Sequence, residues 1–195
     1  IVKDQAMWVD IGVRIGELQE KELSDLEGAI DSYRDVLAQQ PTHAGAIAAL
    51  ERLAVDESVR ARAIEVLEPL HREASRNDSL ARILELKLEV MEDPTERFTQ
   101  LLTLAELHEI GLSDPETAFD VYARALSEDS SKTEVMEALE RIAGAGQLWK
   151  KLAEVYEERA QDVFDVEVER SILKRLGEIM EVHLGDARGA IAAYR

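Results

Sequence analysis

Apolar residues recur along this chain at intervals of three and four, which is the spacing of one face of an α-helix. The pattern is interrupted at Asp, Ser, Gly and Pro residues, which cap or end helices. These two signals predict about eleven helices. They span residues 4–22, 25–39, 42–54, 57–75, 78–91, 93–112, 114–128, 131–145, 147–162, 165–184 and 186–195. No stretch alternates strongly enough to predict a β-strand, so the predicted fold class is all-α.

One stretch of this pattern occurs three times. Adding 89 to a residue number in the first copy gives the second copy, and adding a further 72 gives the third. Seven positions carry the same residue in every copy: Asp4/Asp93/Asp165, Glu17/Glu106/Glu178, Glu20/Glu109/Glu181, Leu23/Leu112/Leu184, Asp25/Asp114/Asp186, Ala29/Ala118/Ala190 and Tyr33/Tyr122/Tyr194. Such repetition is typical of stacked helical units that cannot bury their apolar faces alone. It predicts related hairpins at 4–39, 93–128 and 165–195, with divergent helices at 42–92 and 131–162.

The repeated residues suit the parts of a helix hairpin. The repeated Asp stands where one helix turns into the next, and Ser24 with Glu27 has the spacing of a capping box. An alanine follows four residues after that Asp, and a tyrosine four residues later, so both lie on one helix face. We expect the alanine to let the two helices approach closely. The tyrosine should fill the gap one turn later and place its hydroxyl in polar surroundings.

These residues resemble a tetratricopeptide repeat. The order is a small residue in the first helix, a turn Asp, Ala four residues later, an aromatic residue four after that, then Ala-Leu and a closing Pro, which Ser130 replaces in the second copy. The first copy supplies Gly16, Asp25, Ala29, Tyr33, Leu37 and Pro41, and the second supplies Ala105, Asp114, Ala118, Tyr122, Ala125 and Leu126. The chain departs from the family where Gly12, Leu101 and Leu173 replace an early Trp, and its hairpin turn is one residue longer.

The wider pattern is similar to divergent tetratricopeptide-like arrays in large bacterial proteins. The resemblance implies a single domain over residues 1–195, built as a right-handed α-solenoid of antiparallel hairpins. Both ends of the chain look cut, because it lacks an initiator Met and stops inside the third copy, so we expect a segment of a longer protein. The last helix would then lack a covering repeat. The region around Ile191 and Tyr194 is therefore expected to fray or to be covered by a second copy through self-association.

The two repeat spacings differ by 17 residues, about one helix, and the surplus lies between residues 57 and 92. Pro69 falls inside the helix predicted there and should kink or split it. An odd helix would reverse the up-and-down order of the stack unless a short helix merges with its neighbour. The sequence leaves both possibilities open.

Charge narrows the classes of partner. The chain has 41 acidic and 23 basic residues, which gives a formal net charge of -18. A field of that sign disfavours nucleic acid and anionic membranes. No apolar run approaches the length of a membrane span, and the N-terminus lacks the shape of a signal peptide, so a soluble and cytoplasmic protein is expected. The absence of cysteine excludes disulfides, thiolate metal sites and cysteine nucleophiles.

The sequence predicts no catalytic, cofactor-binding or metal-binding residue. The four histidines, His43, His71, His108 and His183, form no HExxH motif and no pair at i, i+4 spacing. The GAGQ segment at 144–147 lies between two helices and lacks the Lys of a phosphate loop. We therefore expect a protein that is not an enzyme. An enzyme whose pocket joins a histidine to two or more acids is the remote alternative.

Two glutamate positions recur where neither capping nor packing requires an acid. They are Glu17, Glu106 and Glu178, and Glu20, Glu109 and Glu181. If the resemblance holds, the first helix of each hairpin lines a concave groove, and these carboxylates would face it. The competing interpretation is a solvated face with local ion pairs, such as Glu17 with Lys21 or Glu178 with Arg175. A lysine and asparagine clamp for carboxylate tails, known in the family, is not expected, because the chain's one Asn is Asn77 and only Lys174 is near such a position.

The resulting hypothesis is a non-catalytic scaffold for protein–protein contacts. An acidic concave groove would bind a basic or mixed basic–apolar segment of a protein or peptide. The alternative is a spacer that only positions neighbouring domains. No cofactor is expected in either case.

Overall fold

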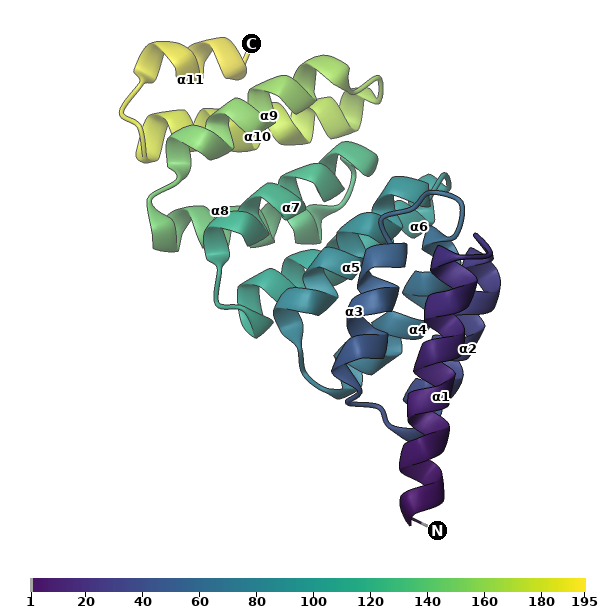
Figure 1. The fold of residues 1–195 in the computed structure, drawn as a ribbon. Helices are drawn as coiled ribbons and strands as arrows, with labels where there is room; N and C mark the ends of the chain where they lie inside the picture. The colour runs from purple at the N-terminus through teal and green to yellow at the C-terminus, as the bar shows by residue number, and fades with distance from the viewer. Residues whose placement is uncertain (1) are drawn as a thin grey trace. The chain divides into compact units, whose positions relative to one another are not determined.

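The computed structural model describes residues 2–195, with side chains from residue 5 onward. Over these residues the chain forms eleven α-helices and one short π-helical segment, η1, and no strand (Figure 1). The helices are α1 Val2–Lys21, α2 Leu26–Gln39, α3 Ala44–Leu53, α4 Arg60–Glu73, α5 Asn77–Val90, α6 Pro94–Glu106, α7 Pro115–Glu128, α8 Thr133–Gly146, α9 Trp149–Asp162, α10 Val166–Val182 and α11 Ala187–Ala193. The segment η1 covers Leu107–Gly111 and continues α6. The all-α prediction is confirmed, and each predicted helix has a counterpart whose ends differ by a few residues.

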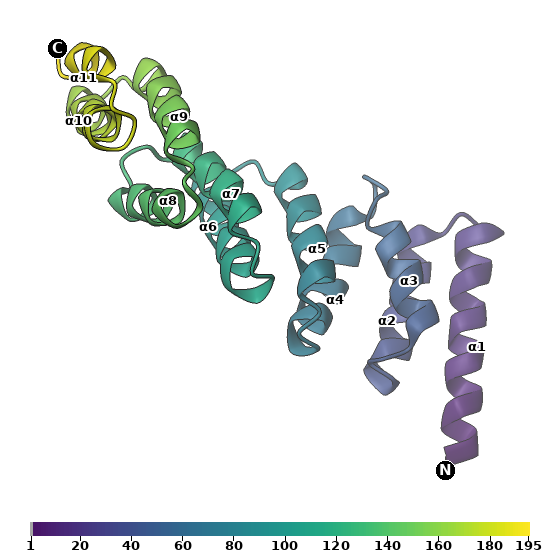
Figure 2. The same ribbon diagram turned by 90° about the vertical axis from the view of Figure 1, so that its left-hand side faces the viewer.

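The helices form two compact units, one ending at Met91 and the other running from Glu92 to Arg195. Within each unit every helix packs against the next one in the chain, and neighbouring helices run antiparallel (Figure 2). Two second-next pairs also touch, α2 with α4 and α7 with α9. Each unit is thus a stack of antiparallel helices. The single domain over 1–195 and the right-handed superhelix depend on how the two units are placed, and both stay predictions.

The surplus helix of the first unit is α5. It follows α4 after a short turn and packs against it, and the two do not merge. Pro69 lies inside α4, which continues to Glu73. Of the two outcomes expected at Pro69, a split helix is therefore wrong, and a kink stays a prediction. The proline removes one backbone donor, and packing of the flanking buried residues Leu67 and His71 keeps the helix intact around it.

The turn between the two helices of a repeated hairpin is wide. In the first copy the N–H of Leu23 donates to the carbonyl of Leu18 at 3.2 Å, and the N–H of Asp25 donates to that of Gln19 at 2.8 Å. The same pair of bonds closes the turn in the other two copies. The residue before the Asp has a positive φ in each copy: 54° at Ser24, 55° at Ser113 and 67° at Gly185. This wide closure accounts for the long turn of each repeated hairpin.

The repeated Asp, and not the serine before it, caps the second helix. Asp25 accepts from the N–H of Gly28 at 3.0 Å, and Asp114 accepts from that of Thr117 at 3.1 Å. The capping box predicted from Ser24 is wrong, because a left-handed residue cannot take the extended conformation of an N-cap. Asp93 and Asp165 also cap their helices, whereas the side chain of Asp4 lies outside the described residues.

The repeated alanine is buried in every copy, and its place at a tight helix crossing stays a prediction. Ala29 and Ala118 are completely buried, and Ala190 is nearly so. The small residue of the first helix has a different neighbour, the ring of the repeated tyrosine. A Cβ added to Gly16 would lie 2.6 Å from Cε1 of Tyr33. The tyrosine ring therefore fills the space over the small residue, and its hydroxyl reaches the end of the first helix.

Candidate functional site

The second repeated glutamate lies beside the hydroxyl of the repeated tyrosine. The hydroxyl donates to the carboxylate at 3.2 Å in the pair of Tyr33 and Glu20, 3.4 Å in that of Tyr122 and Glu109, and 3.3 Å in that of Tyr194 and Glu181. Each contact joins the two helices of one hairpin. The glutamate therefore satisfies the polar tip of an otherwise apolar side chain.

An arginine from the next hairpin binds the same carboxylate in two of the three copies. Arg52 of α3 donates to Glu20 through Nε at 3.0 Å and through Nη2 at 2.8 Å. Arg141 of α8 donates to Glu109 through both of its terminal nitrogens. Three helices thus converge on one carboxylate, and we call this arrangement the glutamate–tyrosine–arginine clamp.

A third complete clamp occurs in the divergent hairpin of α8 and α9. Glu140 of α8 accepts from the hydroxyl of Tyr156 at 3.1 Å and from Nη1 of Arg175 at 2.7 Å. Arg175 belongs to α10, the first helix of the following hairpin. The clamp therefore joins successive hairpins at three places in the part of the chain that the structure describes.

The clamps give Glu20 and Glu109 a packing role. Their side chains are only 12% and 17% exposed, and each already has tyrosine and arginine partners. The premise that packing does not require these glutamates is wrong, because it considered the hairpin without its neighbour. The sequence does contain a signal for the clamp, since Arg52 and Arg141 are separated by the same 89 residues as the first two copies.

Shifted pKa values keep the carboxylate of Glu109 ionised and the tyrosine hydroxyls of the clamps protonated. The hydrogen bond from Arg141 holds the pKa of Glu109 below its usual range. Burial and the nearby Glu109 charge raise the pKa of Tyr122 to about 12. Burial and an adjacent glutamate also raise the pKa values of Tyr33 and Tyr156. Each tyrosine therefore stays a hydrogen-bond donor at neutral pH.

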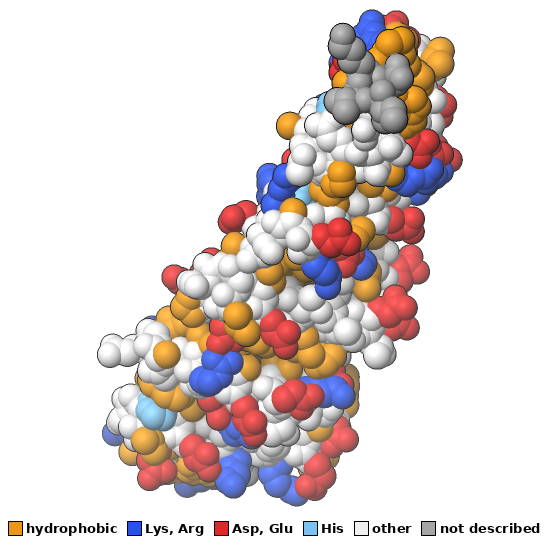
Figure 3. Space-filling view, turned by 90° about the horizontal axis from the view of Figure 1, so that it is seen from below, with side chains coloured by type: hydrophobic (Ala, Val, Ile, Leu, Met, Phe, Trp, Pro, Cys, Tyr) orange, Lys and Arg blue, Asp and Glu red, His pale blue; other side chains and the backbone are white. Residues whose placement is uncertain are grey.

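The first repeated glutamate lies at the surface. Glu17 pairs with Arg14 at 2.9 Å, Glu178 approaches Lys174 at 3.9 Å, and Glu106 is exposed. The expected pairs with Lys21 and Arg175 are wrong, since Arg175 is used by the clamp. Glu181 is exposed as well. Acidic and basic side chains are interspersed on the face drawn in Figure 3, so the excess of acids is not gathered into one field there.

A groove of about 700 Å³ lies between α2 and α4 in the first unit. It is lined by Ile30, Arg34, Leu37, Ala38, Pro41, Thr42, Arg62, Glu65, Val66, Pro69, Leu70, Glu73 and Ala74. Most of this lining is apolar, and the ionic side chains come in both signs. The groove requires two helices that are not consecutive in the chain, and the hydrophobic pattern of either helix alone does not reveal it.

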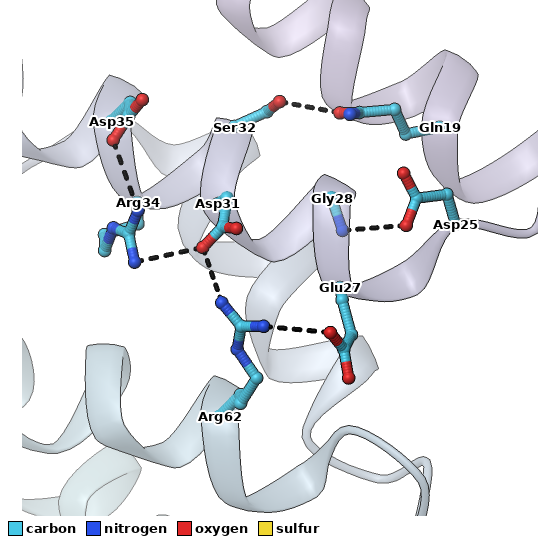
Figure 4. Close-up of polar contacts among 9 residues, drawn as sticks. All are labelled: Gln19, Asp25, Glu27, Gly28, Asp31, Ser32, Arg34, Asp35 and Arg62. Carbon is cyan, nitrogen blue, oxygen red and sulfur yellow. Dashed lines mark hydrogen bonds and ion pairs between the residues drawn. The ribbon is translucent and has the colours of Figure 1, made fainter.

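Ion pairs fix the two arginines of the groove (Figure 4). Arg62 bonds Glu27 at 3.1 Å and Asp31 at 2.7 Å. Arg34 bonds the same Asp31 at 3.0 Å and also lies 3.7 Å from Asp35. With Glu65 and Glu73 of the lining, five carboxylates and two guanidinium groups lie in or beside the groove. The local charge is therefore negative although two arginines are present.

The histidines are dispersed among local roles. The Nδ1 of His43 accepts from the N–H of Ala46 at 3.1 Å and caps α3. His71 is completely buried, with Nε2 at 3.3 Å from Oε1 of Glu51. No group of three His, Cys, Asp or Glu residues suited to a metal ion occurs within residues 2–195 as the structure describes them.

One pocket of the second unit does bring a histidine near two acids. It has a volume of about 260 Å³ and is lined by Glu140, Trp149, Arg175, Glu178, Ile179, Val182 and His183. The ring of His183 stacks on that of Trp149, with centroids 3.6 Å apart, and Glu140 is held by its clamp. The ring of His183 and the carboxylate of Glu140 are therefore already used in contacts within the protein.

None of the described helices combines the length and the apolar character needed to cross a membrane.

A comparison with models of known protein families gives no match, and a comparison with curated proteins gives none either. Among solved structures, the chain is similar to MamA at 16% sequence identity, over 92% of this chain and 90% of that one, with a TM-score of 0.36. That TM-score is too low to carry a conclusion about this chain.

Proposed function

We propose that this chain is a non-catalytic scaffold, and that the groove between α2 and α4 binds a basic, partly apolar segment of another protein. The observation that carries the proposal is the groove itself, which is open, mostly apolar and has a volume of about 700 Å³. Pockets of this size that combine apolar lining with a few polar groups are typical binding sites.

The chemistry of the groove favours a basic partner. Apolar side chains such as Leu37, Val66 and Leu70 can cover the apolar side of a bound segment. Carboxylates outnumber guanidinium groups around the groove, and the chain as a whole carries a formal charge of -18. Lysines or arginines on the segment would therefore be attracted to the rim and steered towards it.

The repeated glutamates have unequal parts in this proposal. The exposed carboxylates of Glu106, Glu178 and Glu181 and the half-buried carboxylate of Glu17 add to the field that attracts a basic segment. Glu20 and Glu109 contribute less, because arginines of the clamps neutralise them. A concave groove lined by all six is therefore the weaker form of the hypothesis.

The test measures binding of a fluorescein-labelled helical peptide made of leucine and lysine, with a leucine and glutamate peptide for comparison. Ala38 lies exposed at the groove, so Ala38→Trp should fill it without disturbing the core. We expect the lysine peptide to bind more tightly than the glutamate peptide. The Ala38→Trp variant should weaken binding by about tenfold, which corresponds to about 1.4 kcal/mol.

The matched control is Ala61→Trp, an exposed position of α4 outside the groove lining, which should change the Kd by less than about twofold. A wild-type chain that binds both peptides equally, or an Ala38→Trp variant that binds normally, would refute the groove as the site. Loss of binding in the Glu106→Lys/Glu178→Lys double variant, with Ala38→Trp unaffected, would instead assign the site to the repeated glutamates.

The spacer is the second candidate function, and the clamps favour it. They fill the joints between hairpins with the protein's own side chains, as expected of a rigid connector. A groove that binds neither peptide supports this alternative. Self-association through the exposed Ile191 and Tyr194 of the C-terminal hairpin stays a prediction.

A further inference from the structure

The side chains that line the groove between α2 and α4 follow one face of each helix. On α4 the lining recurs every three or four residues, at Arg62, Glu65, Val66, Pro69, Leu70 and Glu73. On α2 it recurs at similar intervals from Ile30 to Ala38. The face of α4 is about 16 Å long, or three turns. Two mostly apolar helix faces that meet along such a length form the kind of groove that receives an amphipathic helix.

Pro69 leaves one backbone acceptor of α4 without its helical donor. In an α-helix the N–H of residue 69 would bond to the carbonyl of Glu65, four residues earlier, and proline has no N–H. Glu65 and Pro69 both line the groove, and both are exposed. The wall of the groove therefore offers a carbonyl oxygen that can accept a hydrogen bond from a bound molecule.

Two carboxylates accompany this carbonyl. Glu65 and Glu73 stand one turn before and one turn after Pro69, and neither has an ion-pair partner within the residues that the structure describes. The side chains of a helix lean towards its N-terminus, so the carboxylate of Glu73 lies over the turn that holds Pro69. Glu68, outside the groove lining, bonds Lys87 at 2.7 Å. The acids of α4 that line the groove are thus free, whereas their neighbour is neutralised.

The arginines of the groove do not supply the missing donor. Arg34 and Arg62 both bond Asp31, at 3.0 Å and 2.7 Å (Figure 4). A guanidinium group has five N–H donors in one plane, so it can pair with a carboxylate and also donate to a nearby carbonyl. An ammonium group is a point charge and lacks this planar fork. The free acceptors around Pro69 therefore fit an arginine better than a lysine.

We propose that the groove receives an amphipathic α-helix of another protein, anchored by an arginine that pairs with the carboxylate of Glu73 and donates to the carbonyl of Glu65. This inference rests on the proposed function, because it takes the groove as the binding site. Val66 and Leu70, half-buried against the core, form the apolar floor on α4. Apolar side chains one turn apart on the bound helix pack against them.

The test uses fluorescein-labelled helical peptides of about 14 residues, or four turns, and the full 195-residue chain. Two peptides share one leucine pattern and carry either arginine or lysine at the polar positions. We expect the arginine peptide to bind about fivefold more tightly, which corresponds to about 1 kcal/mol. An arginine peptide with a central proline cannot form a continuous helix and should bind about tenfold more weakly than its parent.

Pro69→Ala isolates the contribution of the carbonyl. Alanine supplies the N–H that bonds to the carbonyl of Glu65, so the acceptor is used inside α4 and the helix is not weakened. The preference for arginine over lysine should fall below about twofold, while the Kd of the lysine peptide changes by less than about twofold. Glu73→Gln removes the charge and keeps the size of the side chain, and should weaken the arginine peptide by about fivefold.

Two substitutions outside the groove are the matched controls. Pro115→Ala changes an exposed proline at the start of α7, where no helical bond is missing. Glu57→Gln removes an exposed carboxylate of the first unit that does not line the groove. Neither should change the preference for the arginine peptide. Helix content by circular dichroism verifies that each variant is folded.

The outcomes separate this inference from the proposed function. An arginine preference that persists in Pro69→Ala would overturn the anchor, and so would equal weakening of both peptides. Undiminished binding of the proline-containing peptide would overturn the helical occupant. If Ala38→Trp still weakens binding in these cases, the groove remains the site. A chain that binds neither peptide, or an Ala38→Trp variant that binds both normally, would instead remove the proposed function and this inference with it.

Discussion

At the scale of single residues, the clamp shows how a repeated glutamate can serve packing. A buried tyrosine needs a partner for its hydroxyl, and the glutamate supplies an acceptor. That carboxylate would be costly to enclose alone, and an arginine from the next hairpin compensates its charge. In the Glu109 clamp the tyrosine tip is thereby satisfied and two hairpins are joined through one group.

Removal of one clamp arginine provides a test at this scale. We expect Arg141→Ala to lower the free energy of unfolding by about 1 kcal/mol, because Glu109 keeps Tyr122 but loses its counter-charge. The expected loss of free energy is modest because the side chain of Arg141 is more than half exposed. Urea unfolding measures the change.

Arg170→Ala is the matched control in the same unit, since Arg170 pairs with Glu167 at an open surface site. It should cost less than about 0.5 kcal/mol. Equal effects of the two substitutions would show that the clamp stabilises no more than an ordinary surface ion pair.

The buried His71 predicts a dependence of stability on pH. Burial lowers its pKa in the folded protein, and the charges of Arg76 and Arg82 act in the same direction, whereas Glu51 acts against them. The unfolded chain takes up a proton near pH 6.5, so the unfolded state binds more protons below that pH. The contribution of His71 to the free energy of unfolding should therefore be complete above about pH 6.5. It should decrease as the pH falls through that value.

Thermal unfolding of the wild type and of His71→Leu across this pH range checks the prediction. The variant should lose part of the decrease at low pH, because it has no group to protonate at that position. His43, His108 and His183 are common to both proteins, so the difference between the curves isolates His71. Parallel curves would contradict a role for His71 in this pH dependence.

At the scale of helices, the repeated turn and the repeated alanine set the geometry of each hairpin. Each wide turn contains one residue with a positive φ, and the Asp after that residue caps the second helix. The alanine then allows the two helices to pack closely enough for the tyrosine to reach the glutamate. A larger residue in place of the alanine would push the two helices apart and move the tyrosine away from the glutamate.

The expected cost of such a change is measurable. Ala118→Leu introduces three carbon atoms where the side chain is completely buried between α6 and α7. Overpacking of this kind should destabilise the protein by about 1–3 kcal/mol. Ala145→Leu, at an exposed position of α8, is the control and should change stability little. A harmless Ala118→Leu in urea unfolding would show that the hairpin contact is looser than the burial indicates.

At the scale of the whole molecule, the excess of acids is the dominant electrostatic feature. A net charge of -18 produces repulsion that opposes a compact state, while the clamps and surface pairs offset it locally. Salt screens long-range repulsion more than the short contacts of partly buried pairs. We therefore expect added sodium chloride to raise the unfolding temperature. An unfolding temperature that falls with salt would mean that attractive pairs outweigh the repulsion.

The sequence by itself determined the elements and their repetition. Helical periodicity, caps and turn residues are local properties, and they were sufficient to predict all eleven helices and the buried positions of Ala29 and Tyr33. The threefold recurrence of residues such as Tyr122 also predicted that the units are stacked hairpins. Local signals were insufficient at Ser24 and Pro69, where the hydrogen bonds of the turn and the packing of α4 decided the outcome.

Only the tertiary structure decided which charged residues are committed and which are available. Glu20 and Glu178 look equally exposed in the periodic pattern of their own helices. Arg52, from a helix beyond the hairpin, reaches Glu20, whereas Glu178 has only Lys174 at 3.9 Å. The groove between α2 and α4 likewise depends on two helices separated by a third. Periodicity describes one helix at a time, whereas a clamp or a groove requires several helices in register, and that register is set by packing.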